Sequence, residues 1–71
     1  MTRSEELRKK IQKSGYKYKF LASALGLSYY ALKLKIDNKN DFTASEICTL
    51  CDILKITSLK EKEYIFFASN V

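Results

Sequence analysis

Residues 20–36, FLASALGLSYYALKLKI, carry the clearest indication of how this chain folds. In the first part of this stretch, apolar residues recur at the spacing of one face of an α-helix: Phe20, Leu21, Ala24 and Leu25. Gly26 then interrupts the pattern, because glycine is unfavourable inside a helix and suits the turn that follows one. We therefore expect a helix over about residues 17–25, then a turn at Gly26 with Leu27 buried in it.

The second part of the stretch permits two interpretations. Residues 32–36 alternate apolar and basic side chains, which is the period of a half-buried strand. Ser28, however, is a good N-cap for a helix, and Leu32 and Ile36 lie four residues apart, on one helical face. We predict a helix that follows Ser28 and runs to Ile36, because nothing else in the chain could pair with a strand. The outward face of this helix would then carry Tyr29, Tyr30, Lys33 and Leu34.

The rest of the chain also carries signals of helices. A hydroxyl residue followed three positions later by glutamate, the pattern of a capping box, occurs at Thr2, Thr43 and Ser58. These starts predict helices over about residues 3–14, 44–54 and 59–68, with Gly15 ending the first. Their expected inward stripes are Leu7 and Ile11 in the first helix, and Ile47, Leu50, Cys51 and Leu54 in the second.

Composition supports a small helical domain. The chain has 71 residues, of which 46% are hydrophobic, with no proline and only two glycines. A β-sandwich or barrel needs many turn residues, and this chain lacks them. The predicted fold class is therefore all-α, in a single domain.

Charge is distributed unevenly along the chain. The net charge is +5, with residues 1–40 contributing ten basic and three acidic side chains and residues 41–71 three basic and five acidic ones. The first part therefore carries +7 and the second −2. Such asymmetry indicates a polyanionic partner, either nucleic acid or an acidic membrane surface, although a lysine-rich surface without a partner has the same composition.

Several classes of function are disfavoured. Cys48 and Cys51 form a C-x-x-C pair, but a zinc site would need two further ligands, and the chain has no histidine and no third cysteine. We expect these thiols on or near the buried face of a helix. Without a metal constellation, a histidine or a phosphate loop, we expect no enzyme and no cofactor. No apolar run approaches the length of a membrane span and no signal peptide begins the chain, so we expect a cytoplasmic protein.

Two short helices joined at a glycine resemble the helix-turn-helix, over about residues 17–36. Ala22 fits the small residue where the two helices meet, and Gly26 fits the turn. The further segments DNKNDFTASEI, LCDIL and EKEYIFFA resemble the small Cro and repressor proteins of temperate phages of Gram-positive bacteria. This resemblance covers about residues 5–68. It implies a five-helix lambda-repressor-like domain over residues 1–71.

The resemblance implies a sequence-specific DNA-binding regulator of a phage lysis/lysogeny switch, acting in the bacterial cytoplasm on double-stranded DNA. The second helix of the motif would lie in the major groove, and residues near the start of the first would contact the backbone. Carried over by position, the DNA-binding residues would be Lys17, Tyr18, Lys19, Ser28, Tyr29, Tyr30, Lys33 and Leu34.

A second hypothesis stays open beside the first. Tyrosine and leucine on the outward face suit a protein partner as well as they suit DNA, because tyrosine is enriched at interface hot spots. The resemblance then implies a modulator that binds the cognate repressor through Tyr29, Tyr30 and Leu34. The apolar residues 64–67 offer more surface than one short helix buries on one face, which indicates a homodimer or a contact with another protein.

Overall fold

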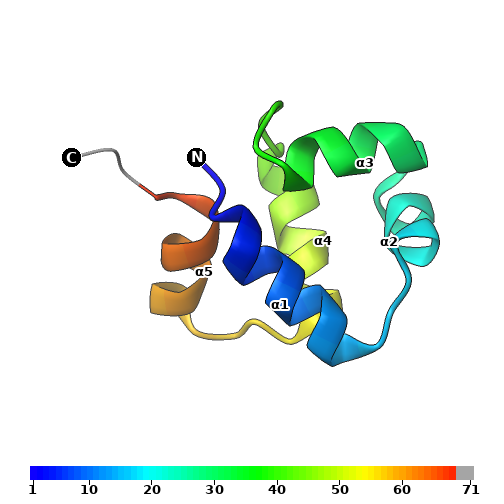
Figure 1. Cartoon of the computed structure of the whole chain (residues 1–71). Helices are drawn as coiled ribbons and strands as arrows, with labels where there is room; N and C mark the ends of the chain where they lie inside the picture. Colours follow the sequence, from blue (N-terminus) through cyan, green and yellow to red (C-terminus); the bar gives the residue numbers. More distant parts are fainter. Residues whose placement is uncertain (69–71) are drawn as a thin grey trace.

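The computed structural model describes residues 1–68, which form five α-helices and no strand (Figure 1). The last three residues of the predicted domain lie outside the described residues. Residues 32–36 are helical, so the strand interpretation is excluded. The helices are α1 (Ser4–Ser14), α2 (Tyr18–Leu25), α3 (Tyr29–Ile36), α4 (Ala44–Leu54) and α5 (Leu59–Phe66).

Helix ends largely follow the chemistry of the sequence. Gly15 and Gly26 each end a helix in the left-handed conformation, with φ of 80° and 70°, where a Cβ would be unfavourable. Thr43 forms the complete predicted capping box with Glu46 at the start of α4. Ser58 forms only half of one: its hydroxyl accepts from the Glu61 N–H, while the Glu61 carboxylate pairs with Lys10 instead.

The capping box predicted at Thr2 is wrong. α1 begins at Ser4 after Arg3, which contributes no side-chain cap. Thr2 is buried, and its backbone N–H donates to the Asn38 side-chain oxygen at 2.9 Å. The first residues are also held by α5, because the Arg3 N–H donates to the Ile65 carbonyl at 2.7 Å. Tertiary contacts therefore decide how the chain enters α1.

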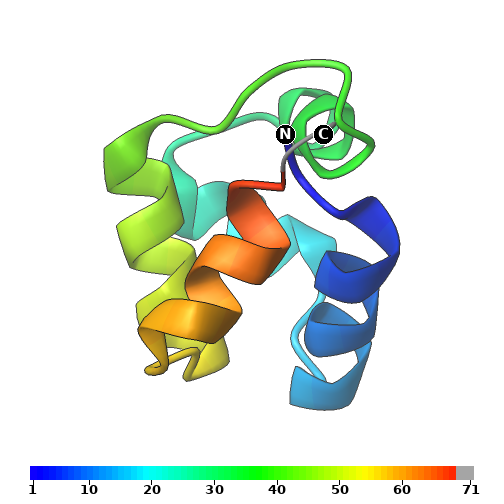
Figure 2. The ribbon, with the colours of Figure 1, turned by 90° about the vertical axis from the view of Figure 1, so that its left-hand side faces the viewer.

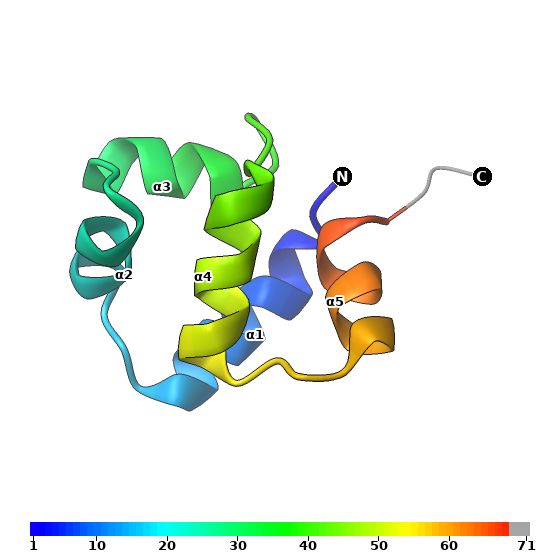
Figure 3. The same cartoon turned by 180° about the vertical axis from the view of Figure 1, so that it is seen from behind.

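One hydrophobic core joins the five helices. α2 packs on α3 and α4, and α1 packs on α3, α4 and α5. Figures 1 and 3 place α5 at one end of the molecule and α2 at the other, and Figure 2 looks at the molecule from the α5 end. All residues predicted for the inward stripes of α1, α3 and α4 are buried. The core consists of Leu7, Ile11, Leu21, Ala22, Leu32, Ile36, Phe42, Ile47, Leu50, Cys51, Leu54, Ile56, Ile65 and Phe66.

The inward face of α2 differs from the prediction. Leu21 and Ala22 are buried and Leu25 packs against the core, but Phe20 is 51% exposed and Ala24 is exposed. Phe20 lies about 100° away from Leu21 around the helix, so α2 cannot bury both when its centre of contact falls on Leu21 and Ala22. Likewise, α5 ends at Phe66 and not at residue 68.

The helices are short. The longest, α1 and α4, have 11 residues each, whereas roughly 20 apolar residues are needed to cross a bilayer. Within residues 1–68, no helix has both the length and the apolar character of a membrane span.

Candidate functional site

The connection between α2 and α3 is a tight turn closed by two backbone hydrogen bonds. The Leu27 N–H donates to the Ala22 carbonyl at 2.8 Å, and the Gly26 N–H donates to the Ser23 carbonyl at 3.1 Å. These two bonds, with Gly26 left-handed, are those of a Schellman motif. Leu27 is only partly buried, packed against the core. The turn sets α3 steeply across α2: Figure 1 shows α3 along its length and α2 nearly end-on.

α3 presents its first turn to solvent. The Ser28 hydroxyl caps the helix by accepting from the Ala31 N–H at 3.1 Å, as the sequence predicted. Tyr29 is 50% exposed and Tyr30 is 71% exposed, the highest value among the large apolar side chains. The first turn of α3 is therefore open to a partner over most of its outer surface.

Lys33 and Leu34 are less exposed than the sequence predicted. Both are half-buried. The loop after α3 turns back onto its last turn, where the Lys39 and Asn40 N–H groups both donate to the Leu34 carbonyl, at 2.8 and 3.2 Å. Lys33 and Leu34 still share the outer side of α3 with Tyr30, at spacings of three and four residues.

The residues predicted to contact the DNA backbone lie next to α3, and both line a shallow hollow of about 620 Å³. Lys17, Tyr18 and Lys19 line it at the start of α2, and Tyr29 lines it from α3. The rings of Tyr18 and Tyr29 have their centroids 6.3 Å apart. The structure therefore brings these four predicted residues together, while Tyr30, Lys33 and Leu34 lie along α3 outside the hollow.

α1 also contributes to the hollow, through Arg8, Ile11 and Gln12. No sequence pattern indicates this contribution, because it depends on how α1 packs. Arg8 forms an ion pair with Asp37, the residue that ends α3. Tyr16, in the connection before α2, lines the same hollow and stacks on Phe20 with ring centroids 5.0 Å apart.

Ion pairs divide the basic residues into two groups. Arg8, Lys9, Lys10 and Lys35 each pair with a carboxylate. Among the described residues, no carboxylate lies within 4 Å of Lys17, Lys19 or Lys33. The cations at the start of α2 and on the outer side of α3 therefore have no carboxylate partner among the described residues.

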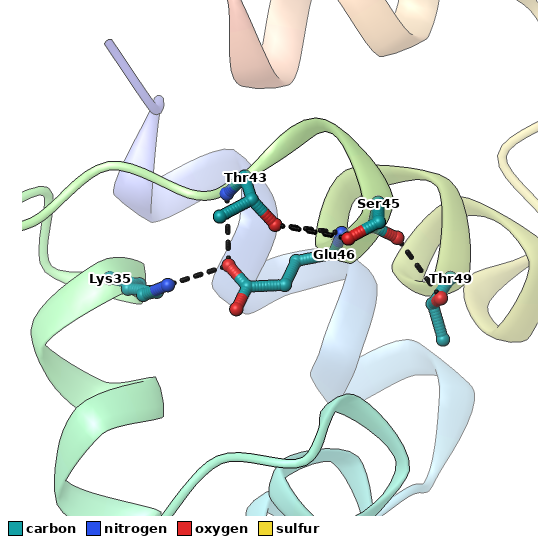
Figure 4. A network of polar contacts seen from close by, with 5 residues as sticks. All are labelled: Lys35, Thr43, Ser45, Glu46 and Thr49. Carbon is teal, nitrogen blue, oxygen red and sulfur yellow. Dashed lines mark hydrogen bonds and ion pairs between the residues drawn. The ribbon is translucent and has the colours of Figure 1, made fainter.

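Lys35 serves the fold and does not add to this surface. Its ammonium group donates to the Glu46 carboxylate at 2.6 Å, and the same oxygen accepts the Thr43 backbone N–H at 2.9 Å (Figure 4). Burial alone would raise the pKa of Glu46, but the hydrogen bonds from Lys35 and Thr43 outweigh it and hold that pKa below its usual value. The network fastens the last turn of α3 to the first turn of α4.

The two cysteines lie on α4, where Cys51 is buried and Cys48 is exposed. Burial raises the pKa of the Cys51 thiol. Only one of the two thiols is therefore part of the core, while both were expected on or near the buried face. Within residues 1–68, no group of three or more histidine, cysteine, aspartate or glutamate side chains could hold a metal ion.

A family model described as "Protein of unknown function (DUF739)" matches residues 4–68. The match therefore spans all five helices and the hollow between α1, α2 and α3. Comparison with curated proteins and with solved structures found no match.

Proposed function

The chain belongs to the DUF739 family, and we propose that it is a sequence-specific DNA-binding transcriptional regulator, of the Cro-like kind that acts in a phage lysis/lysogeny switch. In this proposal α2, the turn at Gly26 and α3 form the helix-turn-helix of a lambda-repressor-like domain. The observation that carries it is the position of three unpaired cations, Lys17, Lys19 and Lys33, beside the exposed first turn of α3.

α3 is the recognition helix in this proposal. Its eight residues span about 12 Å, and an α-helix fits the major groove of B-DNA. Tyr29 and Tyr30 stand where the N-terminal residues of a recognition helix contact base edges. Lys33 can donate to guanine O6 and N7, and Leu34 can pack against a thymine methyl group. Both side chains keep part of their surface in solvent, which this contact requires.

The start of α2 is suited to a phosphate group. Lys17 is its N-cap but offers no side-chain oxygen, so the first N–H groups of the helix have no capping acceptor. Free N–H groups at a helix N-terminus attract an anion, and Lys17 and Lys19 add two positive charges there. The adjoining hollow would receive the sugar–phosphate backbone of the DNA strand that flanks α3.

The experiment is a salt titration of binding to specific and random duplexes. Lys17→Ala and Lys19→Ala should each weaken binding to all sequences and reduce the salt slope by about one counterion. Lys33→Ala should instead cost on the order of 1–3 kcal/mol on the preferred site and little on random DNA.

Lys60→Ala is the matched control, because Lys60 is an exposed lysine of α5, at the other end of the molecule. Its salt slope should equal that of the unchanged chain to within measurement error. Binding without salt dependence, or an equal loss in all four variants, would contradict the proposal.

The exposure of Tyr30 favours a second candidate function. An aromatic side chain that is 71% exposed gives little base discrimination but is typical of an anchor at a protein interface. We propose as the alternative that Tyr29, Tyr30 and Leu34 bind the DNA-binding domain of the cognate repressor. The unpaired lysines around this apolar centre would steer an acidic partner. Such a modulator would change DNA binding by covering the repressor's own recognition surface.

A further inference from the structure

A pair of exposed aromatic side chains lies where the chain passes from α1 into α2. Residues 16–20 read YKYKF, so aromatic and basic residues alternate there. Tyr16 is 43% exposed and Phe20 is 51% exposed. Their rings stack on each other, with 5.0 Å between the centroids and 20° between the ring planes. We call these two stacked rings the aromatic pair.

Hydrogen bonds of the backbone hold the aromatic pair in position. Gly15 ends α1 in the left-handed conformation, and the Tyr16 N–H donates to the Ser14 hydroxyl at 3.2 Å. That hydroxyl donates in turn to the Ile11 carbonyl at 2.6 Å. Phe20 stands in the first turn of α2. Because the backbone beneath both rings is already fixed, a flat ligand that stacks on them would lose little affinity to backbone ordering.

Tyr16 stands between two hollows, and both are lined by lysines. The first is the hollow of about 620 Å³ between α1, α2 and α3, which contains Lys17 and Lys19. The second, of about 340 Å³, lies between the ends of α1 and α4 and contains Lys13 and Lys55. Within residues 1–68, no carboxylate lies within 4 Å of these four lysines. Positive charge without an acidic partner therefore lies on both sides of the aromatic pair.

We propose that this surface binds single-stranded nucleic acid, with an unpaired base stacked on the aromatic pair and the flanking phosphates beside the lysines. Every base has a flat π-face, so aromatic side chains bind unpaired bases with little regard to sequence. Lysines in the adjoining hollows supply the charge that the phosphate backbone requires. A duplex covers both faces of each base with its neighbours, so duplex DNA cannot use the aromatic pair in this way.

The order of the groups on this surface favours a nucleic-acid strand over an acidic protein segment. A single strand repeats a flat ring and an anionic phosphate along its length. The surface offers lysines, then stacked rings, then lysines again, from Lys13 past Tyr16 and Phe20 to Lys19. An acidic protein segment would satisfy the lysines, but it carries a flat ring only where its sequence happens to place one.

This inference goes beyond the proposed function and stands without it. Duplex recognition is assigned to α3, whereas the aromatic pair and Lys13 lie outside that helix. Lys17 and Lys19 would serve both ligands, so a single strand and a duplex should compete for the chain. The test therefore relies on residues that only one of the two ligands uses.

The test is fluorescence anisotropy of labelled oligothymidylate and oligouridylate of about 12 nucleotides, a length within the range of single-stranded binding modules. Binding to either oligomer supports the proposal, and the tighter of the two identifies the better ligand. An abasic strand of the same length keeps the phosphates and lacks the bases. It should bind about fivefold more weakly or worse, because it cannot stack.

Substitutions test the two parts of the surface separately. Tyr16→Ala and Phe20→Ala should each weaken single-strand binding about fivefold or more. Phe67→Ala is the matched control, because Phe67 is a similarly exposed phenylalanine at the end of α5, and it should leave the affinity unchanged. Lys13→Ala should lower the salt slope by about 0.7, the value for one phosphate contact on a single strand, whereas Lys60→Ala should not.

Duplex binding measured on the same variants separates this proposal from the proposed function. Phe20→Ala should leave duplex affinity unchanged, and Lys33→Ala should lower it while leaving single-strand affinity unchanged. Circular dichroism of each variant checks the fold. The proposal is overturned if neither oligomer binds, as expected of a surface that serves a protein partner. Equal binding of the abasic strand, or an equal loss in Phe67→Ala, would also overturn it.

Discussion

Replacing Glu46 with alanine should destabilise the fold more than the loss of any other ion-paired carboxylate. The Glu46 carboxylate accepts the Thr43 N–H and the Lys35 ammonium group, and only 12% of its side chain is exposed. Loss of the capping-box bond costs about 1 kcal/mol. The Lys35 side chain, 15% exposed, would lose its charged partner, at a further cost of about 1–3 kcal/mol.

The free energy of unfolding should therefore fall by about 2–4 kcal/mol. For a domain of this size each kcal/mol lowers Tm by about 4–8 °C, so a loss of about 3 kcal/mol corresponds to roughly 12–24 °C. Urea and thermal unfolding followed by circular dichroism would measure both quantities. Glu6→Ala is the matched control, because its pair with Lys9 is long, at 3.8 Å, and exposed; it should cost less than about 1 kcal/mol.

A double-mutant cycle makes this prediction sharper. Lys35→Met in the Glu46→Ala background removes the orphaned charge, so the double variant should be more stable than Glu46→Ala alone. If Glu46→Ala and Glu6→Ala lower the stability equally, the network in Figure 4 does not hold α3 on α4 as we argue.

Four further predictions concern single substitutions. The pKa of Glu46 is lower in the folded chain than its ordinary 4.5. Its contribution to stability is therefore complete above pH 4.5 and is lost as the pH falls through the folded pKa. When unfolding is measured as a function of acid pH, the free energy of unfolding of Glu46→Gln should fall less steeply than that of the unchanged chain. Gly26→Ala should cost about 1–2 kcal/mol in urea unfolding, because φ is +70° although a Cβ would meet no atom. Lys55→Gly should instead stabilise the chain by up to about 1 kcal/mol, since Lys55 ends α4 at φ 58°; equal signs for these two variants would contradict the backbone argument. Tyr30→Ala should cost about 2 kcal/mol or more of affinity for a repressor partner if the alternative function holds, and unchanged affinity in a folded variant would remove Tyr30 from that interface.

The parts of the fold that could be predicted from the sequence are those set by interactions between residues close together in the chain. Gly15, Gly26, Ser28 and Thr43 act through backbone geometry or hydrogen bonds within four residues, and each stands where the pattern placed it. The ends of α1 and α2 and the starts of α3 and α4 follow from these signals. The failure at Thr2 has the opposite cause: its N–H bonds to Asn38, 36 residues away, a contact that no local pattern reveals.

The width of a buried face is harder to predict than its direction. Because Phe20 and Leu21 belong to the same apolar pattern, we predicted that both face the core. The buried residues of α2 are instead Leu21 and Ala22. For the candidate site, residues of α2 and α3 could be predicted to lie together because the turn at Gly26 joins the two helices. The contribution of Arg8 and Gln12 from α1 could not be predicted, because it depends on contacts between residues far apart in the sequence.

The pairing of charges links the stability of the fold to its proposed function. Three of the ion pairs join different elements: Arg8 with Asp37 holds α1 to the end of α3, Lys10 with Glu61 holds α1 to α5, and Lys35 with Glu46 holds α3 to α4. Lys17, Lys19 and Lys33 take no part in these ion pairs, and Lys33 lies on the same side of α3 as Tyr30, the most exposed aromatic side chain of the described residues. Because salt screens exposed charges more than it weakens a buried core, rising ionic strength should abolish polyanion binding well before it unfolds the helices.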